Sequence, residues 1–338
     1  MNEIDKLCKK LLKYPNVTGY AKMLQKRIRK GETVDEQCIQ VHVREKVSEK
    51  MLRMQDIIPR ALEGMPIDVV FVGDLKIPLP PKRKVMVAEK TGTIRPLVAG
   101  ISVGNVAITA GTLGAFMEKA KSPDKGEVFL GSNSHVLCDE PKNETSGEKR
   151  IFQPGRYDGG SEAVAEYYWH KQLNAQETPS TCGISEGITG FLNSMSKALS
   201  RKTRFITVVE ETNLIDFAVA RLITPWENKF FDVEFPPEKF EFAGLGFAGS
   251  DQVSLACKSK YILEEGYKPL GYEICEVNAG DLLHKTGRTS CYSKAAAILE
   301  SAYEVVSYGA YSVAFDDVVV TAKMLEPGDS GSSVWREK

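Results

Sequence analysis

The chain has 338 residues, of which 42% are hydrophobic and 26% are charged, and its formal net charge is −1. This length is enough for two or three domains, and the composition is that of a globular protein, which excludes disorder over the whole chain. A net charge close to zero creates no overall field that would attract nucleic acid or an anionic membrane, so neither is expected as a partner.

The cysteines and the N-terminus indicate a reducing compartment. The seven cysteines are scattered and form no C-x-x-C pair, so we expect free buried thiols and no zinc site. Residues 1–13 contain no apolar core of signal-peptide length, and no window approaches the ~18 to 20 apolar residues of a membrane span. These features predict a cytoplasmic protein that uses neither a metal nor a cofactor.

Residues 1–75 are expected to form a small α+β domain. Residues 1–13 favour a short helix, and Val17–Arg29 and Cys38–Arg44 favour extended segments, the second with alternating apolar residues. Asp68–Gly73 predicts a buried strand that ends in a turn. Residues 76–95 then hold several prolines and a Lys/Arg cluster, which predicts a linker because proline stiffens the chain and stops helices.

Residues 96–338 differ in pattern, because short β-type runs alternate with glycine-rich turns. The runs are Gly100–Ile108, Gly111–Phe116, Val128–Leu130, Phe205–Val209, Phe217–Leu222 and Val313–Thr321. This spacing predicts an antiparallel β barrel or sandwich and not βαβ units. Ser161–Leu173 and Gly187–Leu199 interrupt the pattern, and we expect them to be helices of an insertion around residues 150–204.

His135 and Asp216 each lie in a sequence setting that suits a catalytic group, His135 as a base and Asp216 as an acid. His135 ends a small polar turn after the apolar run Val128–Leu130, at a strand end, and histidine changes its charge near neutral pH. The alternative is a buried histidine that only closes a loop. Asp216 leads into the apolar run Phe217–Leu222, where a carboxylate is costly to bury unless something satisfies it. Orienting a histidine would satisfy it, and the alternative is an acid bonded to backbone amides.

Ser330 lies in the run Pro327–Ser332, between small, turn-forming residues. Glycine allows a sharp turn that exposes the serine hydroxyl, and the amides of Gly328 and Ser330 can point at the oxyanion that forms when a carbonyl is attacked. Such a serine is a nucleophile only if a base and an orienting acid stand nearby. The sequence therefore predicts a catalytic triad of His135, Asp216 and Ser330.

The order histidine, aspartate, serine along the chain is a known triad order, and on these motifs the chain resembles the trypsin-like (chymotrypsin-fold, S1-type) serine proteases. Ser132–Leu137 is similar to the histidine motif of the bacterial Deg-type and related branches, and Gly328–Gly331 is similar to the nucleophile motif. Ala99–Asn105 and Thr109–Gly114 are similar to the opening of the barrel in the prokaryotic members. Phe152–Gly160 and Gly287–Thr289 are similar to segments of a subgroup that carries an N-terminal α+β domain.

The resemblance implies a mainly β, two-barrel chymotrypsin-like fold preceded by a small α+β domain. It implies a hydrolase, a serine-type endopeptidase that acts on peptide or protein substrates. His135 is then the general base, Asp216 orients it, Ser330 attacks the carbonyl, and the Gly328 and Ser330 amides hold the oxyanion. The resemblance also implies that Met324 and Leu325 form an apolar floor of the substrate pocket, which disfavours Lys or Arg substrates.

Two features depart from the family pattern. Family members continue past the nucleophile into strands that complete the second barrel, whereas this chain ends eight residues after Ser330. We therefore expect a truncated second barrel with an open edge that can pair with another chain, so a homo-oligomer is left open. Asp329 matches an acid that in secreted zymogens pairs with a newly cut N-terminus. No cleavage site is obvious, so we expect no zymogen step, and Asp329 must find another partner or stay solvated.

Other interpretations of the chain remain. His42 is expected to be a strand surface or core residue, and His170 to pack on the insertion helix. His284 and Gly287–Ser290 form a rival site that suggests phosphate binding, but no G-x-x-x-x-G-K-[ST] pattern is present, and we interpret it as a β-hairpin turn. A catalytically inactive binding or scaffolding protein on the same fold is the second hypothesis for function. A cysteine- or metal-dependent enzyme is the third hypothesis and the weakest. No thiol has a basic, glycine-rich setting, and no metal-ligand spacing recurs in the sequence.

Overall fold

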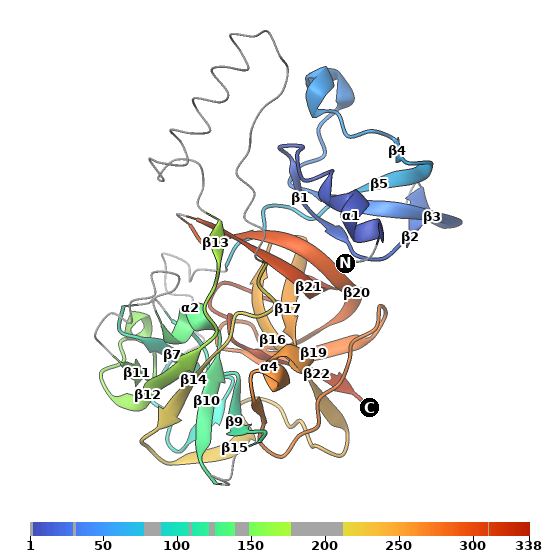
Figure 1. The fold of residues 1–338 in the computed structure, drawn as a ribbon. Coiled ribbons are helices and arrows are strands. Elements are labelled where there is room, and N and C mark those ends of the chain that lie inside the picture. Colours follow the sequence, from blue (N-terminus) through green and yellow to red (C-terminus); the bar gives the residue numbers. More distant parts are fainter. Residues whose placement is uncertain are drawn as a thin grey trace.

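The computed structural model describes residues 3–29, 32–77, 89–107, 110–121, 126–138, 149–176, 212–309 and 311–338. The chain is built mainly of β-strands in a twelve-stranded and an eight-stranded sheet, which confirms the prediction of a mainly β protein (Figure 1). Two predicted elements, the helix Gly187–Leu199 and the strand Phe205–Val209, lie outside the described residues.

The N-terminal unit combines one helix with part of the twelve-stranded sheet. Its elements are α1 (Glu3–Lys9), β1 (Val17–Ala21), β2 (Gln25–Arg29), β3 (Glu32–Val43), β4 (Ala61–Leu62), β5 (Met65–Phe71) and the 3-10 helices Glu49–Met51 and Met54–Asp56. Strand β3 pairs with β1 and β2 in antiparallel fashion and with β5 in parallel. The second half of β3 is buried, so its alternating apolar residues pack under α1 in a core of their own.

The rest of the twelve-stranded sheet comes from the C-terminal half of the chain. Its strands are β13 (Ala175–Gln176), β16 (Phe240–Gly249), β17 (Val253–Lys258), β19 (Leu282–Gly287), β20 (Cys291–Ser307), β21 (Ser312–Ala322) and β22 (Ser333–Glu337), with helix α4 (Ser259–Glu264) after β17. All the pairings among these strands are antiparallel. Strand β1 also pairs with β20, and this joins the N-terminal unit to the remainder of the sheet.

Six of these strands form a closed ring. Their order is β16, β17, β21, β20, β19 and β22, and β22 pairs again with β16. The expectation of an open second barrel is therefore wrong. The ring closes because β19, which precedes the nucleophile motif and pairs with β20, also pairs with β22, which follows that motif. One apolar cluster takes a residue from every strand of the ring, which identifies it as the ring's interior.

The eight-stranded sheet has the order β18-β9-β10-β14-β12-β11-β7-β8. Its elements are β7 (Ser102–Asn105), β8 (Gly111–Thr112), β9 (Ala115–Lys119), β10 (Val128–Ser132), β11 (Arg150–Phe152), β12 (Ala163–His170), β14 (Ala218–Leu222) and β18 (Tyr267–Pro269), together with α2 (Ser134–Leu137) and the 3-10 helix Arg156–Asp158. A separate parallel pair joins β6 (Leu97–Ala99) to β15 (Trp226–Phe230).

The helix expected over Ser161–Leu173 is not formed, because most of this segment is strand β12. It pairs with β11 on one side and β14 on the other. Consecutive aromatic residues, Tyr167 to Trp169, favour strands, and two neighbouring strands supply hydrogen-bond partners that a helix would forgo. His170 therefore lies at the end of a strand and not on a helix.

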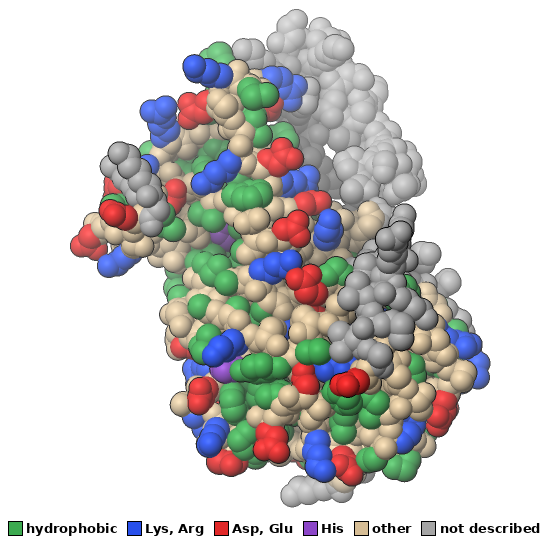
Figure 2. All heavy atoms as spheres, turned by 180° about the vertical axis from the view of Figure 1, so that it is seen from behind, with side chains coloured by type: hydrophobic (Ala, Val, Ile, Leu, Met, Phe, Trp, Pro, Cys, Tyr) green, Lys and Arg blue, Asp and Glu red, His purple; other side chains and the backbone are tan. Residues whose placement is uncertain are grey.

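One large apolar cluster joins the two sheets. It unites Phe129 and Val219 of the eight-stranded sheet with Leu245, Val320 and Trp335 of the ring. The N-terminal unit lies beside β20 and β21, on the opposite side of the ring from the eight-stranded sheet (Figure 1). Figure 2 shows acidic and basic side chains interspersed over the face seen from behind.

Part of the predicted linker is packed into the protein. Residues 78–88 lie outside the described residues, but Lys90 is 1% exposed. Its Nζ atom lies 2.8 Å from Oδ2 of Asp232 and donates a hydrogen bond to Oγ1 of Thr286 at 2.7 Å. The chain that enters the eight-stranded sheet is thus anchored on the β19–β20 hairpin.

Candidate active site

The histidine and aspartate of the predicted triad meet because their strands are neighbours. His135 lies in α2, directly after β10, and Asp216 lies just before β14. Strands β10 and β14 pair in antiparallel fashion, with Ser132 opposite Ala218, so the end of one adjoins the start of the other. The Nδ1 atom of His135 lies 2.5 Å from Oδ2 of Asp216.

Asp216 is fully buried and held by several donors. Its Oδ1 accepts hydrogen bonds from the backbone amides of Ser134 (2.6 Å) and His135 (3.4 Å). Its Oδ2 accepts one from the hydroxyl of Tyr308 at 2.7 Å, in addition to the contact with His135. Burial by itself would raise the pKa of Asp216, but the His135 ring and these donors hold the pKa below its usual range, so the acid remains ionised.

The buried thiol of Cys257 contacts the backbone of Asp216 and is uncharged. The backbone amide of Asp216 donates to Sγ of Cys257 at 3.3 Å. Burial raises the pKa of Cys257 well above its usual value, so it remains a neutral thiol. No disulfide joins the cysteines in the part of the chain that the structure describes; Cys182 lies outside it.

Ser330 lies in the turn before β22 and belongs to the ring, whereas His135 and Asp216 belong to the eight-stranded sheet. The turn docks on that sheet. The amide of Thr112 in β8 donates to the carbonyl of Ser330 at 2.8 Å. A Cβ on Gly331 would overlap the hydroxyl of Ser132, at the end of the strand that leads to His135. The tertiary structure thus brings the nucleophile motif against the histidine motif.

Four buried polar atoms of the two motifs have no hydrogen-bond partner among the described residues: Nε2 of His135, Oγ of Ser330, Oδ1 of Asn133 and Oγ of Ser332. Most buried polar side-chain atoms in folded proteins are satisfied, so an unsatisfied one calls for an explanation, and a catalytic role is one such explanation. Catalytic hydrogen bonds are often long in unliganded sites and tighten only around the substrate. The histidine therefore has its Nδ1 side occupied by the acid and its Nε2 side unused.

The predicted oxyanion amides are also unused. Gly328 and Ser330 donate no backbone hydrogen bond to any residue that the structure describes. Gly328 has a φ of +99°, a conformation that glycine adopts without strain. Its carbonyl is turned toward Thr112, whose Oγ1 donates to it at 3.1 Å. The turn can thus offer two amides to a ligand.

The β19–β20 hairpin, interpreted from the sequence as a turn of a rival site, supports the nucleophile turn. Arg288 in this hairpin forms a two-pronged ion pair with Asp158, at 2.6 and 2.9 Å, and both side chains are 4% exposed. The Oδ2 atom of Asp158 also accepts from Ser102 of β7 at 2.5 Å. The hairpin is therefore fastened to the eight-stranded sheet. Sequence reasoning missed this role, although charged residues within a run of small ones were a signal.

The other histidines make contacts of their own and are not bonded to the triad residues by any described hydrogen bond. His42 is 1% exposed and pairs with Glu304, where β3 and β20 flank β1. His170 accepts or donates a bond to the hydroxyl of Tyr167 at 2.6 Å. His284 does the same with Tyr292 at 2.7 Å, and burial lowers the pKa of His284. These three rings pack within the fold.

Met324 and Leu325 are 4% exposed and belong to the apolar interior of the ring. Their backbone amides both donate to Oγ of Ser254 at 3.0 Å. Their contacts are those of core residues, and a role in substrate binding stays a prediction.

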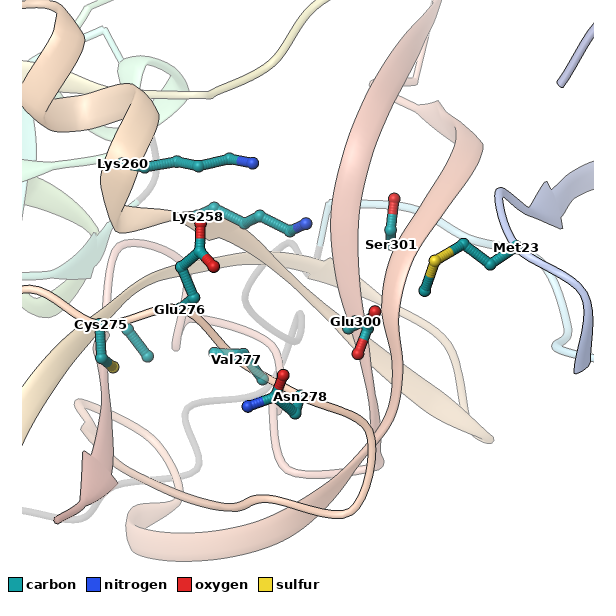
Figure 3. Close-up of a pocket in the computed structure, with 10 residues that line it drawn as sticks. Met23, Lys258, Lys260, Cys275, Glu276, Val277, Asn278, Glu300 and Ser301 are labelled. Carbon is teal, nitrogen blue, oxygen red and sulfur yellow. The ribbon is translucent and has the colours of Figure 1, made fainter. Parts of the chain in front are cut away.

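A cavity of about 130 Å³ lies elsewhere, between the ring and the loop after β1 (Figure 3). Its lining includes Met23, Lys258, Lys260, Glu276 and Glu300, and none of the triad residues. Lys258 and Lys260 are already paired with Asp317, at 2.6 and 3.0 Å, so their charge is compensated within the protein.

Comparison with known proteins does not assign a family or a function to the chain. No protein-family model matches the chain, and no curated protein is significantly similar to it. Among the described residues, no group of three or more His, Cys, Asp or Glu side chains is placed to hold a metal ion. No helix in the described ranges is long and apolar enough to cross a membrane.

Proposed function

We propose that the chain is a serine endopeptidase on a two-barrel chymotrypsin-like fold, with Ser330 as nucleophile. The observation that carries this proposal is the His135–Asp216 pair at 2.5 Å, with a fully buried acid, beside a serine turn whose hydroxyl has no partner among the described residues. A buried, ionised acid on Nδ1 fixes the tautomer in which Nε2 accepts a proton.

The mechanism follows from these positions. His135 Nε2 takes the proton of the Ser330 hydroxyl as its oxygen attacks the peptide carbonyl, and the Gly328 and Ser330 amides donate to the resulting oxyanion. When the C–N bond breaks, His135 gives its proton to the leaving amine, and an acyl-enzyme remains. Water then attacks the ester by the same route and releases the acid. Asp216 stabilises the imidazolium throughout and is not itself protonated.

The sheets support the two-barrel assignment. Strands β8 and β9 are separated by two residues, so Gly111–Lys119 pairs with β7 at its start and with β10 at its end. The eight-stranded sheet thereby curls round on itself beside the closed ring. The resemblance places further strands that complete the second barrel after the nucleophile. We infer that β19 and β20 take their place from an earlier part of the chain.

An inactive scaffold on the same fold is the competing function. It is favoured by one observation, that no hydrogen bond joins Ser330 to His135 in the structure. Chemical reactivity of the serine separates the two functions, because a buried serine without a working base does not react with electrophiles faster than free serine.

The test is covalent labelling of the folded chain with a fluorophosphonate, which reacts with activated serines, followed by identification of the labelled peptide. We expect labelling at Ser330, none in Ser330→Ala, and a rate lower by about 10⁴ in His135→Ala. Ser332→Ala is the matched control, because Ser332 is equally buried and also lacks a side-chain partner among the described residues. The control should be labelled at the wild-type rate. A folded wild type that is not labelled would support the scaffold instead.

A further inference from the structure

A fully buried ion pair lies directly behind the nucleophile turn. Asp329 precedes Ser330, and its Oδ2 atom lies 2.5 Å from Nζ of Lys285 in β19. Both side chains are 0% exposed. Such a pair is weak evidence for stability, because two charges lose their hydration and well-packed apolar residues often serve as well. Because the pair lies beside the candidate nucleophile, a role in the site explains its presence better than a role in stability.

The Asp329 carboxylate ties the turn to the β19–β20 hairpin. Its Oδ1 accepts from the amides of Thr289 (2.9 Å) and Ser290 (3.1 Å). Its Oδ2 accepts from the amide of Glu326 (2.9 Å) and the hydroxyl of Ser290 (2.5 Å), besides Lys285. Burial would raise the pKa of Asp329, but Lys285 and these donors hold the pKa below its usual range. The carboxylate is therefore ionised and immobilised.

The same hairpin surrounds Gly328. A Cβ at this position would overlap Nη1 of Arg288 and lie 2.6 Å from Oγ1 of Thr289. Thr289 Oγ1 also donates to the carbonyl of Pro327 at 2.7 Å. The hairpin thus holds Pro327 and Asp329, the two residues on either side of Gly328, whose amide is one of the two proposed oxyanion donors.

We propose that Lys285 is a positioning residue, whose ammonium group holds Asp329 in the interior and so keeps the Gly328 and Ser330 amides aligned for an oxyanion. The chain supplies the cation from within β19, so the site is assembled without a newly cut N-terminus. This inference rests on the proposed function, because the alignment matters only if Ser330 attacks a carbonyl.

The test replaces Lys285 with methionine, an unbranched side chain that is one heavy atom shorter and carries no charge. In Lys285→Met we expect the rate of fluorophosphonate labelling to fall about 10²- to 10³-fold, as when an oxyanion donor is lost. The pH at which labelling is half-maximal should not move, because the His135–Asp216 pair is untouched. The amide hydrogens of residues 326–332 other than Pro327 should exchange faster than in the wild type.

Lys90→Met is the matched control. Lys90 is equally inaccessible, at 1% exposed, and it bonds to Thr286 of the same strand, but its partner is Asp232 and not Asp329. This variant also loses a buried charge, so it reports the general cost of that loss. We expect its labelling rate to stay within about threefold of the wild type once it is folded, with unchanged exchange in residues 326–332.

If Lys285→Met does not fold, the double variant Lys285→Met/Asp329→Asn removes both charges and avoids an uncompensated buried carboxylate. It should show the same loss of labelling and the same faster exchange. Labelling within threefold of the wild type together with unchanged exchange, in either folded variant, would overturn the proposal. If the wild type is not labelled at all, the proposed function fails, and hydrogen exchange alone then decides whether Lys285 positions the turn.

Discussion

At the scale of single residues, the site depends on how Asp216 is held. The acid is fully buried, yet its pKa lies below the usual range because His135, Tyr308 and the Ser134 amide all favour its charged form. Tyr308 directly follows β20, and its ring also meets the His135 ring edge-on, with 5.7 Å between the ring centroids. It therefore restrains both members of the pair.

Substitutions at these two positions should differ sharply in effect. Asp216→Asn removes the charge and favours the wrong tautomer of His135, so the labelling rate should fall about 10⁴-fold. Tyr308→Phe removes one donor and leaves the others, so the rate should fall about tenfold and the free energy of unfolding by about 1 kcal/mol. Labelling kinetics and urea unfolding measure these changes. Equal losses of rate in the two variants would contradict this ranking of roles.

At the scale of elements, the nucleophile turn is clamped between the two sheets. Thr112 of β8 bonds to Gly328 and Ser330 on one side, and the β19–β20 hairpin bonds to Asp329 on the other. Gly331 allows the closest approach, since a Cβ there would overlap Ser132 and lie 2.7 Å from the carbonyl of Thr112. Its φ of +88° adds a conformational requirement.

Alanine substitutions separate these two requirements. Gly280 has a similar φ of +95°, but no heavy atom lies within 4 Å of the point that a Cβ would occupy, so Gly280→Ala should cost only the backbone strain, about 1 kcal/mol. Gly331→Ala adds a clash with backbone and should cost roughly 3 kcal/mol or more and abolish labelling. Urea unfolding of both variants tests this difference. Similar losses of stability would show that the turn tolerates displacement from β8.

At the scale of the whole molecule, long strand β20 connects three regions. It pairs with β19 and β21 in the ring and with β1 of the N-terminal unit. Its residue Glu304 is buried against His42, so the N-terminal unit shares a polar contact as well as a sheet with the ring. The N-terminal unit is thus structurally continuous with the part of the chain that carries Ser330.

Buried acids in both sheets predict how stability depends on pH. The pKa values of Asp216, Asp317 and Asp329 lie below the usual range because, against the effect of burial, cationic partners and donors favour the charged forms. In the unfolded chain an aspartate has a pKa of about 3.9. Below that pH the unfolded state binds more protons than the folded state, so the free energy of unfolding falls as the pH drops.

We therefore expect stability to be fully present above about pH 5 and to be lost progressively below about pH 4, toward the folded-state pKa values. Urea unfolding at pH 7, 5, 4 and 3 measures this loss. Lys285→Met/Asp329→Asn lacks one of the three acids, so its loss should be smaller than that of the wild type. Stability that rises on acidification would contradict the depressed pKa values.

Local pattern predicted many strands and missed others. The runs at Gly111–Phe116, Val128–Leu130, Phe217–Leu222 and Val313–Thr321 correspond to strands β8 and β9, β10, β14 and β21. Strand β20 was not predicted, because its alanines, Ala295 to Ala297 and Ala302, together with Leu299 and two glutamates, have helix propensity. Neighbours on both sides hold it extended. In the same way, pairing with β11 and β14 overrides the helical expectation at β12.

The sequence by itself determined the β-rich class and the candidate groups His135, Asp216, Gly328 and Ser330, because turns, apolar runs and the need for glycine are local properties. Only the tertiary structure decided that the ring closes and that Asp329 has its cation in Lys285. These outcomes depend on contacts between distant segments, such as the 44 residues that separate Lys285 from Asp329. A one-dimensional pattern carries no information on which of many compatible partners a strand or a buried charge will meet.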